Sequence, residues 1–346
     1  MSTRALVARM DNVGDVLLAG PCVRAVAAHV DSLTLLTGPR GRAGGELLPG
    51  VDQVISWCAP WIDPEPPPLT SADAHAFIDR IRALDVDTAL ILTSFHQSPL
   101  PLALLLRMAG VGWIGAISED YPGSLLDLRH RVDGDPPEAE RALSLAEAAG
   151  FRLPPGDDGK LAVRRPLPQV EGLTGEPGYV VVHPAASVPA RQPSALRSAS
   201  IVAALAEAGH RVVVTGAPSE RSLTAAVAGT HAIDLGGATS LAELAAVLDA
   251  AGVVVAPNTG PAHLAAAVGT PVVSLFAPVV PAERWAPYGV PVAMLGDQDA
   301  PCRDSRAREC FVLGHPCLES ISPQQVVAVA EELTAGRECL RTGGMS

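Results

Sequence analysis

The chain has 346 residues, of which 48% are hydrophobic and 3% aromatic, and its formal net charge is -12. This length favours two domains of roughly 150 residues each, and the acidic balance excludes the basic stripe that nucleic-acid binding needs. No stretch reaches the roughly 20 apolar residues of a membrane span, and the first residues run directly into a predicted strand, so we expect a cytoplasmic protein.

In chain order, the first half alternates short apolar runs with helical patterns. Strands are predicted at residues 5–9, 33–37, 53–56 and 88–93, and helices at about 16–28, 72–84 and 100–109. A polar turn, Asp11-Asn12-Val13-Gly14-Asp15, follows the first strand. Strands that alternate with helices predict a parallel, doubly wound sheet.

Residues 166–177 hold several prolines and glycines without a period and are predicted to be a linker. The alternation then restarts, with strands at 179–183, 211–215 and 232–234 and helices at 193–208, 220–228 and 241–250. We therefore predict an α/β protein of two doubly wound, Rossmann-like domains, 1–165 and 178–322, whose loops face a central cleft. A C-terminal helix and tail, 323–346, can pack back on the N-terminal domain.

The most informative stretch runs from residue 252 to 278 and reads as strand, tight turn, helix, turn and strand. Backbone N–H groups of Thr259 and Gly260, with the positive end of the following helix, predict an anion pocket in the turn. Gly260 allows a phosphate to come close, and His263 lies one turn into the helix. A nucleotide diphosphate is the expected occupant.

Four segments together resemble glycosyltransferase family 9, the heptosyltransferase family with the GT-B fold. The likeness covers essentially the whole chain and is most specific in the last segment. The segments are Arg9-Met10-Asp11-Asn12-Val13-Gly14-Asp15 with Pro21, His183-Pro184-Ala185 with Arg191, Thr215-Gly216-Ala217-Pro218-Ser219-Glu220, and residues 234–244 running into Asn258-Thr259-Gly260-Pro261-Ala262-His263.

The resemblance implies inverting transfer of a sugar, heptose from ADP-heptose, to a hydroxyl of a glycan, a lipid-linked sugar or a small natural product. It makes Asp15 the catalytic base, and Asp11 is the alternative for that role or for orienting the acceptor. Against Asp15, a helix N-terminus stabilises its charged form and weakens it as a base. The alternative is that Asp15 only caps the helix.

For donor binding, the resemblance implies Arg191 with Ser187 on the diphosphate, because an arginine fork contacts two phosphate oxygens. Arg197 is an alternative cation. Gly216 is a further donor contact, and Glu220 would accept hydrogen bonds from the ribose hydroxyls. The alternative for Glu220 is stabilising a helix start. The donor-side residues from the last segment are Asn258, Thr259, Gly260, Pro261 and His263.

Two positions depart from the family pattern. Asn258 stands where the family usually has Asp, and Gln192 stands where it commonly has Trp. Asn258 keeps hydrogen-bonding capacity but loses a negative charge near the donor. These departures leave the predicted fold intact and weaken the heptose assignment.

The acceptor is predicted to bind the N-terminal half. The candidate contacts are Asn12, Gly14, His96 and Arg129, with Arg131 and the loops 93–98 and 121–131 around them. His96, Arg129 and Arg131 suit an anionic acceptor, and plain solvent exposure is the alternative for each of them.

We expect no metal and no cofactor. The two Asp-x-Asp matches, at residues 85–87 and 297–299, are short, and the first enters a strand at the wrong end for a cleft. Cys302, Cys310 and Cys317, with His315 between, lack the Cys-x-x-Cys pair that is typical of zinc sites.

We also expect a monomer with at most peripheral membrane contact, the latter if the acceptor is lipid-linked. Two other functions stay open on the same fold. One is a nucleotide-sugar epimerase or hydrolase, and the other is a non-catalytic nucleotide-sugar binder.

Overall fold

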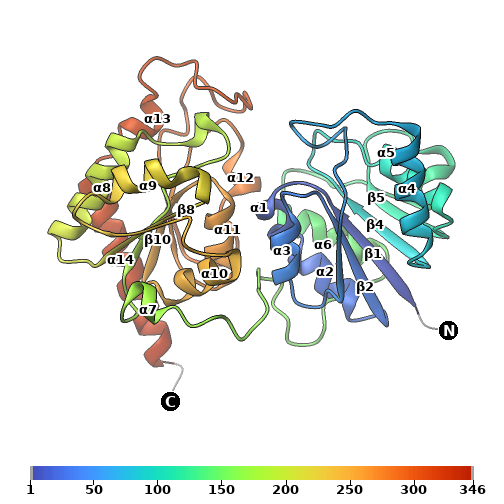
Figure 1. The fold of residues 1–346 in the computed structure, drawn as a ribbon, viewed down its shortest axis with the longest axis horizontal. Coiled ribbons are helices and arrows are strands. Elements are labelled where there is room, and N and C mark those ends of the chain that lie inside the picture. The colour runs from blue at the N-terminus through green and yellow to red at the C-terminus, as the bar shows by residue number, and fades with distance from the viewer. Residues whose placement is uncertain (1–2, 344–346) are drawn as a thin grey trace. The chain divides into compact units, whose positions relative to one another are not determined.

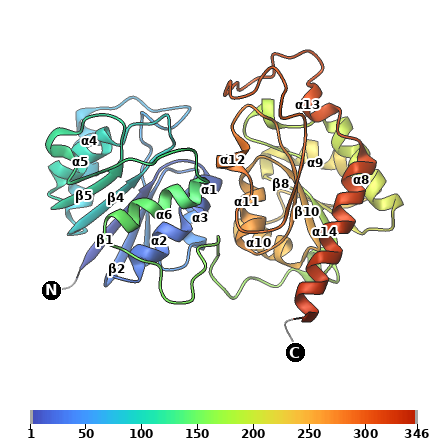
Figure 2. The same cartoon turned by 180° about the vertical axis from the view of Figure 1, so that it is seen from behind.

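The computed structural model describes residues 3–343 and divides into two compact units, one up to Arg164 and one from Arg165. Figures 1 and 2 show the ribbon from opposite sides. Each unit holds one six-stranded sheet, in which the paired strands are parallel and helices follow most strands. The predicted doubly wound α/β architecture is confirmed.

The first unit has the strand order β3-β2-β1-β4-β5-β6. Its strands are β1 (Arg4–Arg9), β2 (Ser32–Thr37), β3 (Gln53–Ser56), β4 (Thr88–Leu92), β5 (Trp113–Ile117) and β6 (Leu128–His130). Its helices are α1 (Val13–Leu18), α2 (Gly20–Ala27), α3 (Arg42–Leu47), α4 (Ser71–Arg82), α5 (Leu100–Ala109) and α6 (Glu138–Ala148). The order reverses direction between β1 and β4, and ligands of such sheets bind beyond the carboxyl ends of the strands at this point.

Both faces of the first sheet are covered by helices, which explains why its strands are apolar runs rather than alternating patterns. Helices α4 and α5 pack together over one face, where Phe77 and Ile81 join Leu102 and Leu106 in the core. Helices α2 and α6 lie side by side over the other face, as Figure 2 shows. The carboxyl ends of the strands are thereby left as the edge at which polar groups can gather.

The second unit repeats this plan with the order β12-β11-β10-β7-β8-β9. Its strands are β7 (Val180–Val182), β8 (Val212–Gly216), β9 (Ile233–Gly236), β10 (Val253–Pro257), β11 (Val272–Leu275) and β12 (Val292–Leu295). Its helices are α7 (Glu171–Thr174), α8 (Ala195–Glu207), α9 (Arg221–Ala228), α10 (Leu241–Ala250), α11 (Gly260–Ala267), α12 (Ala282–Trp285), α13 (Pro316–Glu319) and α14 (Pro323–Gly343). Here the order reverses direction between β7 and β10.

The linker and the C-terminal helix both join the second unit. Residues 166–177 are not a plain linker, because they form α7 and bury Val170 and Thr174 in the second unit. Helix α14 packs on α8 and β10 of the second unit. The reason is its apolar stripe, since Val326 and Ala330 are one helical turn apart and both enter the core beneath the second sheet.

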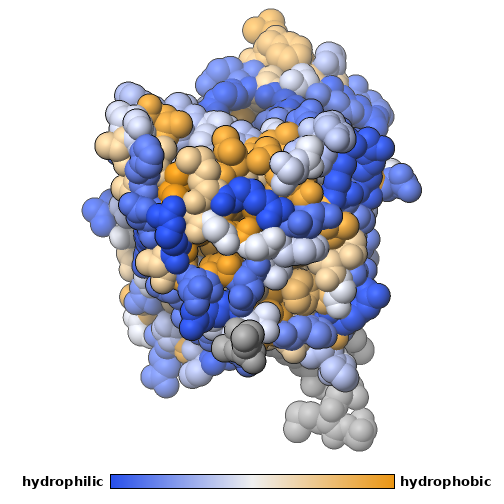
Figure 3. Space-filling model, turned by 90° about the vertical axis from the view of Figure 1, so that its right-hand side faces the viewer, coloured by the Kyte–Doolittle hydropathy of each residue, from blue (hydrophilic) through white to orange (hydrophobic). Residues whose placement is uncertain are grey.

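Some apolar side chains stay at the surface. Figure 3 shows one face of the molecule on which hydrophobic residues gather between hydrophilic ones. On α5, Leu104 and Met108 are about half exposed, at 48% and 50%. Within residues 3–343, no helix combines the length and the apolar character that crossing a membrane requires.

Candidate functional site

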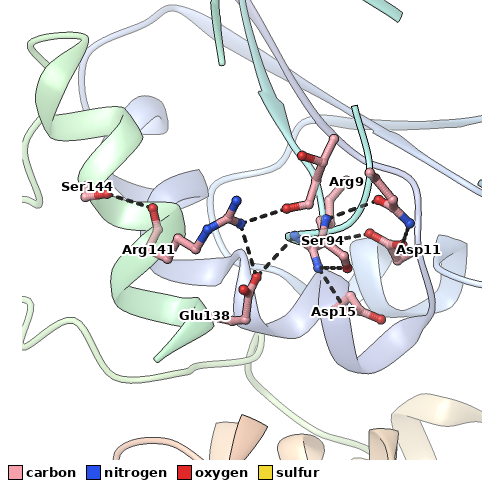
Figure 4. Close-up of polar contacts among 9 residues, drawn as sticks. Arg9, Asp11, Asp15, Ser94, Glu138, Arg141 and Ser144 are labelled. Carbon is pink, nitrogen blue, oxygen red and sulfur yellow. Dashed lines mark hydrogen bonds and ion pairs between the residues drawn. The ribbon is translucent and has the colours of Figure 1, made fainter. Parts of the chain in front are cut away.

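The candidate site of the first unit is built around a buried arginine at the end of β1. Arg9 is only 2% exposed, although the five residues before it form an otherwise largely apolar strand. Its guanidinium is surrounded by carboxylates from the turn after β1 and from the start of α6. We call Arg9, Asp11, Asp15, Ser94 and Glu138 the Arg9 cluster, which Figure 4 shows in close-up.

Each nitrogen of the Arg9 guanidinium meets a different partner. Nη2 donates to Asp15 Oδ1 at 2.9 Å and to Ser94 Oγ at 3.0 Å. Nε lies 3.0 Å from Asp11 Oδ2, an ion pair without hydrogen-bond geometry, and Nη1 lies 3.5 Å from Glu138 Oε2. Burial alone would lower the pKa of Arg9, yet the three carboxylates raise it, so the guanidinium stays charged.

A second arginine supports the cluster from α6. Arg141 Nη1 lies 3.5 Å from Glu138 Oε2 and donates to the carbonyl oxygen of Thr93 at 2.8 Å. Glu138 is 2% exposed, and its Oε1 has no hydrogen-bond partner in the described part of the chain. Three carboxylates therefore face two guanidinium groups, which leaves the centre with surplus negative charge.

Asp11 is the carboxylate of the cluster whose pKa is raised. Burial raises the pKa of Asp11 to about 6, and the charges of Asp15 and Glu138 add to the rise, while Arg9 and a hydrogen bond from Gln97 oppose it. Gln97 Nε2 donates to Asp11 Oδ1 at 2.6 Å, and Gln97 Oε1 accepts from the backbone N–H of Ser94 at 3.1 Å. The loop after β4 is thus tied to the turn after β1.

Asp15 lies in the first turn of α1, but its side chain does not act as the helix cap. Asn12 occupies the N-cap position, is exposed and makes no side-chain capping bond, while Asp15 pairs with Arg9. The Asp15 side chain is 17% exposed, against 9% for Asp11. Of the two aspartates, Asp15 is the one that a ligand can reach more readily.

A glycine loop fixes the backbone of this turn. A Cβ at Gly38, in the loop after β2, would lie 2.3 Å from the carbonyl oxygen of Met10, and one at Gly41 would lie 2.8 Å from that of Asp11. Only glycine permits such an approach without displacing the backbone. Gly14 is buried within α1.

In the second unit, the loop after β7 begins with a buried histidine. His183 Nδ1 lies 3.1 Å from Thr215 Oγ1, and burial lowers the pKa of His183 to about 4, so the ring is neutral at physiological pH. Gln192 Oε1 accepts from the backbone N–H of Ala186 at 3.1 Å and so closes the loop that presents exposed Ser187. Arg191 ends a short 3-10 turn within the same loop.

The turn after β10 lies beside this loop, because β10 and β7 are neighbours in the sheet. Thr259 is the N-cap of α11 and makes no side-chain capping bond, and Pro261 occupies the first turn. Asn258 is 5% exposed, and no described residue accepts a hydrogen bond from its Nδ2. His263 is 4% exposed in the first turn of α11. A buried donor without a partner at a helix N-terminus suits an anionic or hydroxylated ligand.

Two predicted donor residues have structural partners. Glu220 Oε2 accepts from the backbone N–H of Ala217 at 2.7 Å, a contact at the start of a helix, while Gly216 ends β8 against Thr224. Arg197 is engaged elsewhere, since its Nη2 donates to the carbonyl oxygen of Glu319 and its Nε lies 3.8 Å from that carboxylate. Arg197 is therefore a poor substitute for Arg191.

The predicted acceptor contacts His96 and Arg129 lie in different surroundings. His96 is exposed in the loop after β4. The Arg129 guanidinium donates to the carbonyl oxygens of Ser118, at 3.1 Å, and Glu119. Arg129 thus holds the end of β5, and its guanidinium has a structural role there.

Cys302, Cys310 and Cys317 form no metal-binding arrangement with the other described residues. Cys302 and Cys317 are buried in the core of the second unit, and Cys310 packs against it. His315 Nε2 lies 3.1 Å from the carbonyl oxygen of Ala190. In the described residues, no three His, Cys, Asp or Glu side chains are grouped so that they could hold a metal ion.

Both units thus carry polar groups where doubly wound folds bind ligands. The family model described as glycosyltransferase family 9 (heptosyltransferase) matches residues 74–314, more than half of the chain. The chain belongs to glycosyltransferase family 9. It is therefore a glycosyltransferase, and the resemblance stated from the sequence is confirmed.

Solved structures agree with this membership. The Escherichia coli ADP-heptose LPS heptosyltransferase II is 18% identical, with a TM-score of 0.74 over 97% of this chain and 100% of that chain. A family 9 glycosyltransferase from Veillonella parvula is 17% identical, with a TM-score of 0.75 over 96% of this chain and 97% of that chain. The E. coli heptosyltransferase WaaC, solved with ADP-2-deoxy-2-fluoro heptose, is 20% identical, with a TM-score of 0.71 over 95% of this chain and 99% of that chain. These likenesses confirm the GT-B fold. No curated protein sequence matches the chain.

Sequence reasoning missed several members of the site. Arg9 stands in a sequence signature that does not mark it as the centre of the site. Ser94 and Gln97 fall within the predicted acceptor loop 93–98 without being singled out, and Glu138 and Arg141 carry no prediction. One signal was available, because a charged residue that ends an apolar, doubly covered strand must find partners when it is buried. The identity of those partners depends on contacts far along the chain.

Proposed function

We propose that this glycosyltransferase moves heptose from ADP-heptose to an acceptor hydroxyl with inversion. The observation that carries the proposal is the Arg9 cluster, which holds a partly exposed carboxylate, Asp15, at the switch point of the first sheet. An acceptor hydroxyl needs a group that takes its proton as it attacks the donor. Asp15 has that role in the proposal, and Asp11 positions Arg9 and Gln97.

The second unit supplies the donor site in this proposal. The diphosphate binds the N–H groups of Thr259 and Gly260 at the start of α11, with Arg191 and Ser187 from the loop after β7. The orphaned Nδ2 of Asn258 donates to the donor, and His263 contacts it from the first turn of α11. Helix dipole and arginine neutralise the leaving diphosphate, so we propose transfer without a metal.

On the acceptor side, Asn12, Gly14 and His96 line the approach to Asp15, and the acceptor is a glycan, a lipid-linked sugar or a small natural product. We also propose that the enzyme acts in the cytoplasm as a monomer. The domain borders predicted from the sequence, with 1–165 for the acceptor and 178–322 for the donor, belong to the same proposal. The division of the structure at Arg165 supports it.

The test separates binding from chemistry. Calorimetry with ADP, GDP, UDP and dTDP, followed by ADP-heptose, identifies the donor, and an acceptor screen with that donor provides the turnover assay. We expect Asp15→Asn to lower turnover by about 10²- to 10⁴-fold, as loss of a general base does, while donor affinity stays unchanged. Asp31→Asn, at a surface position of the same unit that bonds the N–H of Thr3, is the matched control.

The proposal fails in distinguishable ways. Preference for another nucleotide would keep the transferase and discard the ADP-heptose assignment. Undiminished turnover in Asp15→Asn would refute the role of Asp15 as the base. Donor consumption at full rate without any acceptor would favour a hydrolase or epimerase.

A further inference from the structure

The turn that presents Arg191 is bonded to a distant part of the second unit. The backbone N–H of Ala190 donates to the carbonyl oxygen of Arg308 at 2.9 Å. The carbonyl oxygen of Ala190 lies 3.1 Å from Nε2 of His315, a residue 125 positions further along the chain. Because a carbonyl oxygen can only accept, His315 Nε2 is the donor. Both backbone groups of Ala190 are therefore fixed by residues 308–315.

Ala190 occupies a position from which it controls the direction of Arg191. It is the middle residue of the 3-10 turn Pro189–Arg191, and it is 1% exposed in the core of the second unit. Its carbonyl group and the N–H of Arg191 belong to one planar peptide unit. The bond from His315 thus fixes the peptide plane that leads into Arg191, and with it the point from which the Arg191 side chain departs.

His315 itself has a backbone conformation that is unusual for its residue type. Its φ of 48° and ψ of 51° lie in the left-handed region, which costs energy for a residue with a Cβ and is adopted most readily by glycine. His315 is the N-cap of α13, yet its side chain makes no capping bond there. A strained residue that persists points to a function of its side chain. The hydrogen bond to Ala190 is such a function, and glycine could not supply it.

We propose that His315 is a positioning residue for diphosphate binding, an assignment that rests on the proposed function. His315 holds the Pro189–Arg191 turn in the conformation from which Arg191 reaches the phosphate oxygens, without touching the donor itself. When the bond to Ala190 is lost, the turn spends part of its time in other conformations. The apparent affinity for a diphosphate then falls in proportion to the fraction of molecules in the competent conformation.

The bond from His315 can be removed without removing the other ties of this region. Arg308 uses its backbone carbonyl oxygen, which a change of side chain at position 315 does not alter. Glu319, on α13, accepts from the backbone N–H of Ser194 at 2.7 Å and from its Oγ at 2.9 Å. Loss of the His315 ring therefore releases one bond and leaves the region attached at Ala190 N–H and at Ser194.

The experiment compares wild-type protein with His315→Gly, which removes the imidazole and accepts the left-handed backbone without strain. We expect its melting temperature to stay within about 4 °C of wild type, because relief of strain offsets the lost hydrogen bond. Calorimetry should show that ADP binding is weakened about ten-fold, the effect of losing one hydrogen bond that orders the turn. Hydrogen–deuterium exchange of the ligand-free protein should be about ten-fold faster in residues 190–192.

Asp304→Gly is the matched control. Asp304 also has a positive φ, of 56°, and is exposed, so the substitution relieves the same kind of backbone strain. Its backbone N–H bonds the carbonyl oxygen of Pro278, which glycine preserves, and its carboxylate lies 3.6 Å from Arg303. We expect this variant to keep the wild-type affinity for ADP and the wild-type exchange in residues 190–192.

The outcomes separate failure of this inference from failure of the proposed function. If wild-type protein binds ADP and His315→Gly binds it equally well, only the inference is overturned. It is also overturned if affinity falls while exchange in residues 190–192 is unchanged, or if the melting temperature falls with the affinity, since His315 would then support the unit in general. If wild-type protein does not bind ADP, the proposed donor is wrong, and the role of His315 in binding it falls as well.

Discussion

Replacing Asp11 by Asn should change how the stability of the first unit depends on pH. The pKa of Asp11 is about 6 in the folded protein and 3.8 in a model compound, so between these values the folded state binds a proton that the unfolded state has lost. The free energy of unfolding must therefore fall as pH rises through that window. At 1.36 kcal/mol per pKa unit, the loss is about 3 kcal/mol between pH 4 and pH 7.

Asp11→Asn lacks this titration, and the asparagine amide can still accept the hydrogen bond from Gln97. The difference in unfolding free energy, variant minus wild type, should then rise by about 3 kcal/mol from pH 4 to pH 7. Urea unfolding followed by tryptophan fluorescence measures it, since Trp57, Trp61 and Trp113 all belong to the first unit.

Asp133→Asn, at an exposed position of the same unit, is the control and should show a flat difference. A flat difference for Asp11→Asn as well would refute the reasoning, because it would mean that Arg9 compensates fully for burial. A difference that falls as pH rises would mean that attraction to Arg9 outweighs burial and lowers the pKa of Asp11. In either case, Asp11 would not be the group that responds to the surplus negative charge, and another carboxylate of the cluster would have to be.

Two further predictions concern the leaving group. Arg191→Ala should weaken ADP binding about 10- to 100-fold by calorimetry, as expected for charge-assisted hydrogen bonds, whereas Arg197→Ala should have little effect because Arg197 is held by Glu319. Equal losses in the two variants would contradict the assignment of the phosphate contact to Arg191. EDTA should leave turnover unchanged, and loss of activity that magnesium or manganese restores would show that a cation shares the neutralisation.

The fold was predictable because its signals are local. Strands such as β1 and β10 are short apolar runs, and a polar turn or a proline and glycine turn follows each of them at once. Repetition of this unit in both halves specifies parallel sheets, since parallel strands need a helical crossover. The α7 segment escaped notice because four residues are too few to show a helical period.

The site was predictable only at the positions that a motif displays. Asp11 and Asp15 are close in sequence to Arg9, but Ser94 is 85 positions from Arg9, and Gln97 is 86 positions from Asp11. Which distant side chain completes a buried ion cluster depends on the crossover helices and loops, and no local pattern contains that information. The engagement of Arg129 and Arg197 with backbone carbonyls was invisible for the same reason.

The Arg9 cluster also bears on the objection that Asp15, at a helix start and beside an arginine, is too weak a base. A base that accepts its proton only after the bond between the sugar and the leaving diphosphate has largely broken needs correct placement more than a high pKa. Arg9 supplies that placement, because it fixes one oxygen of Asp15 through a 2.9 Å hydrogen bond. Asp11 has the raised pKa, but Arg9 contacts one of its oxygens, Gln97 bonds the other, and its side chain is the less exposed of the two. Accessibility therefore favours Asp15 as the base. The raised pKa of Asp11 comes first from its burial, and the neighbouring carboxylates around Arg9 add to it.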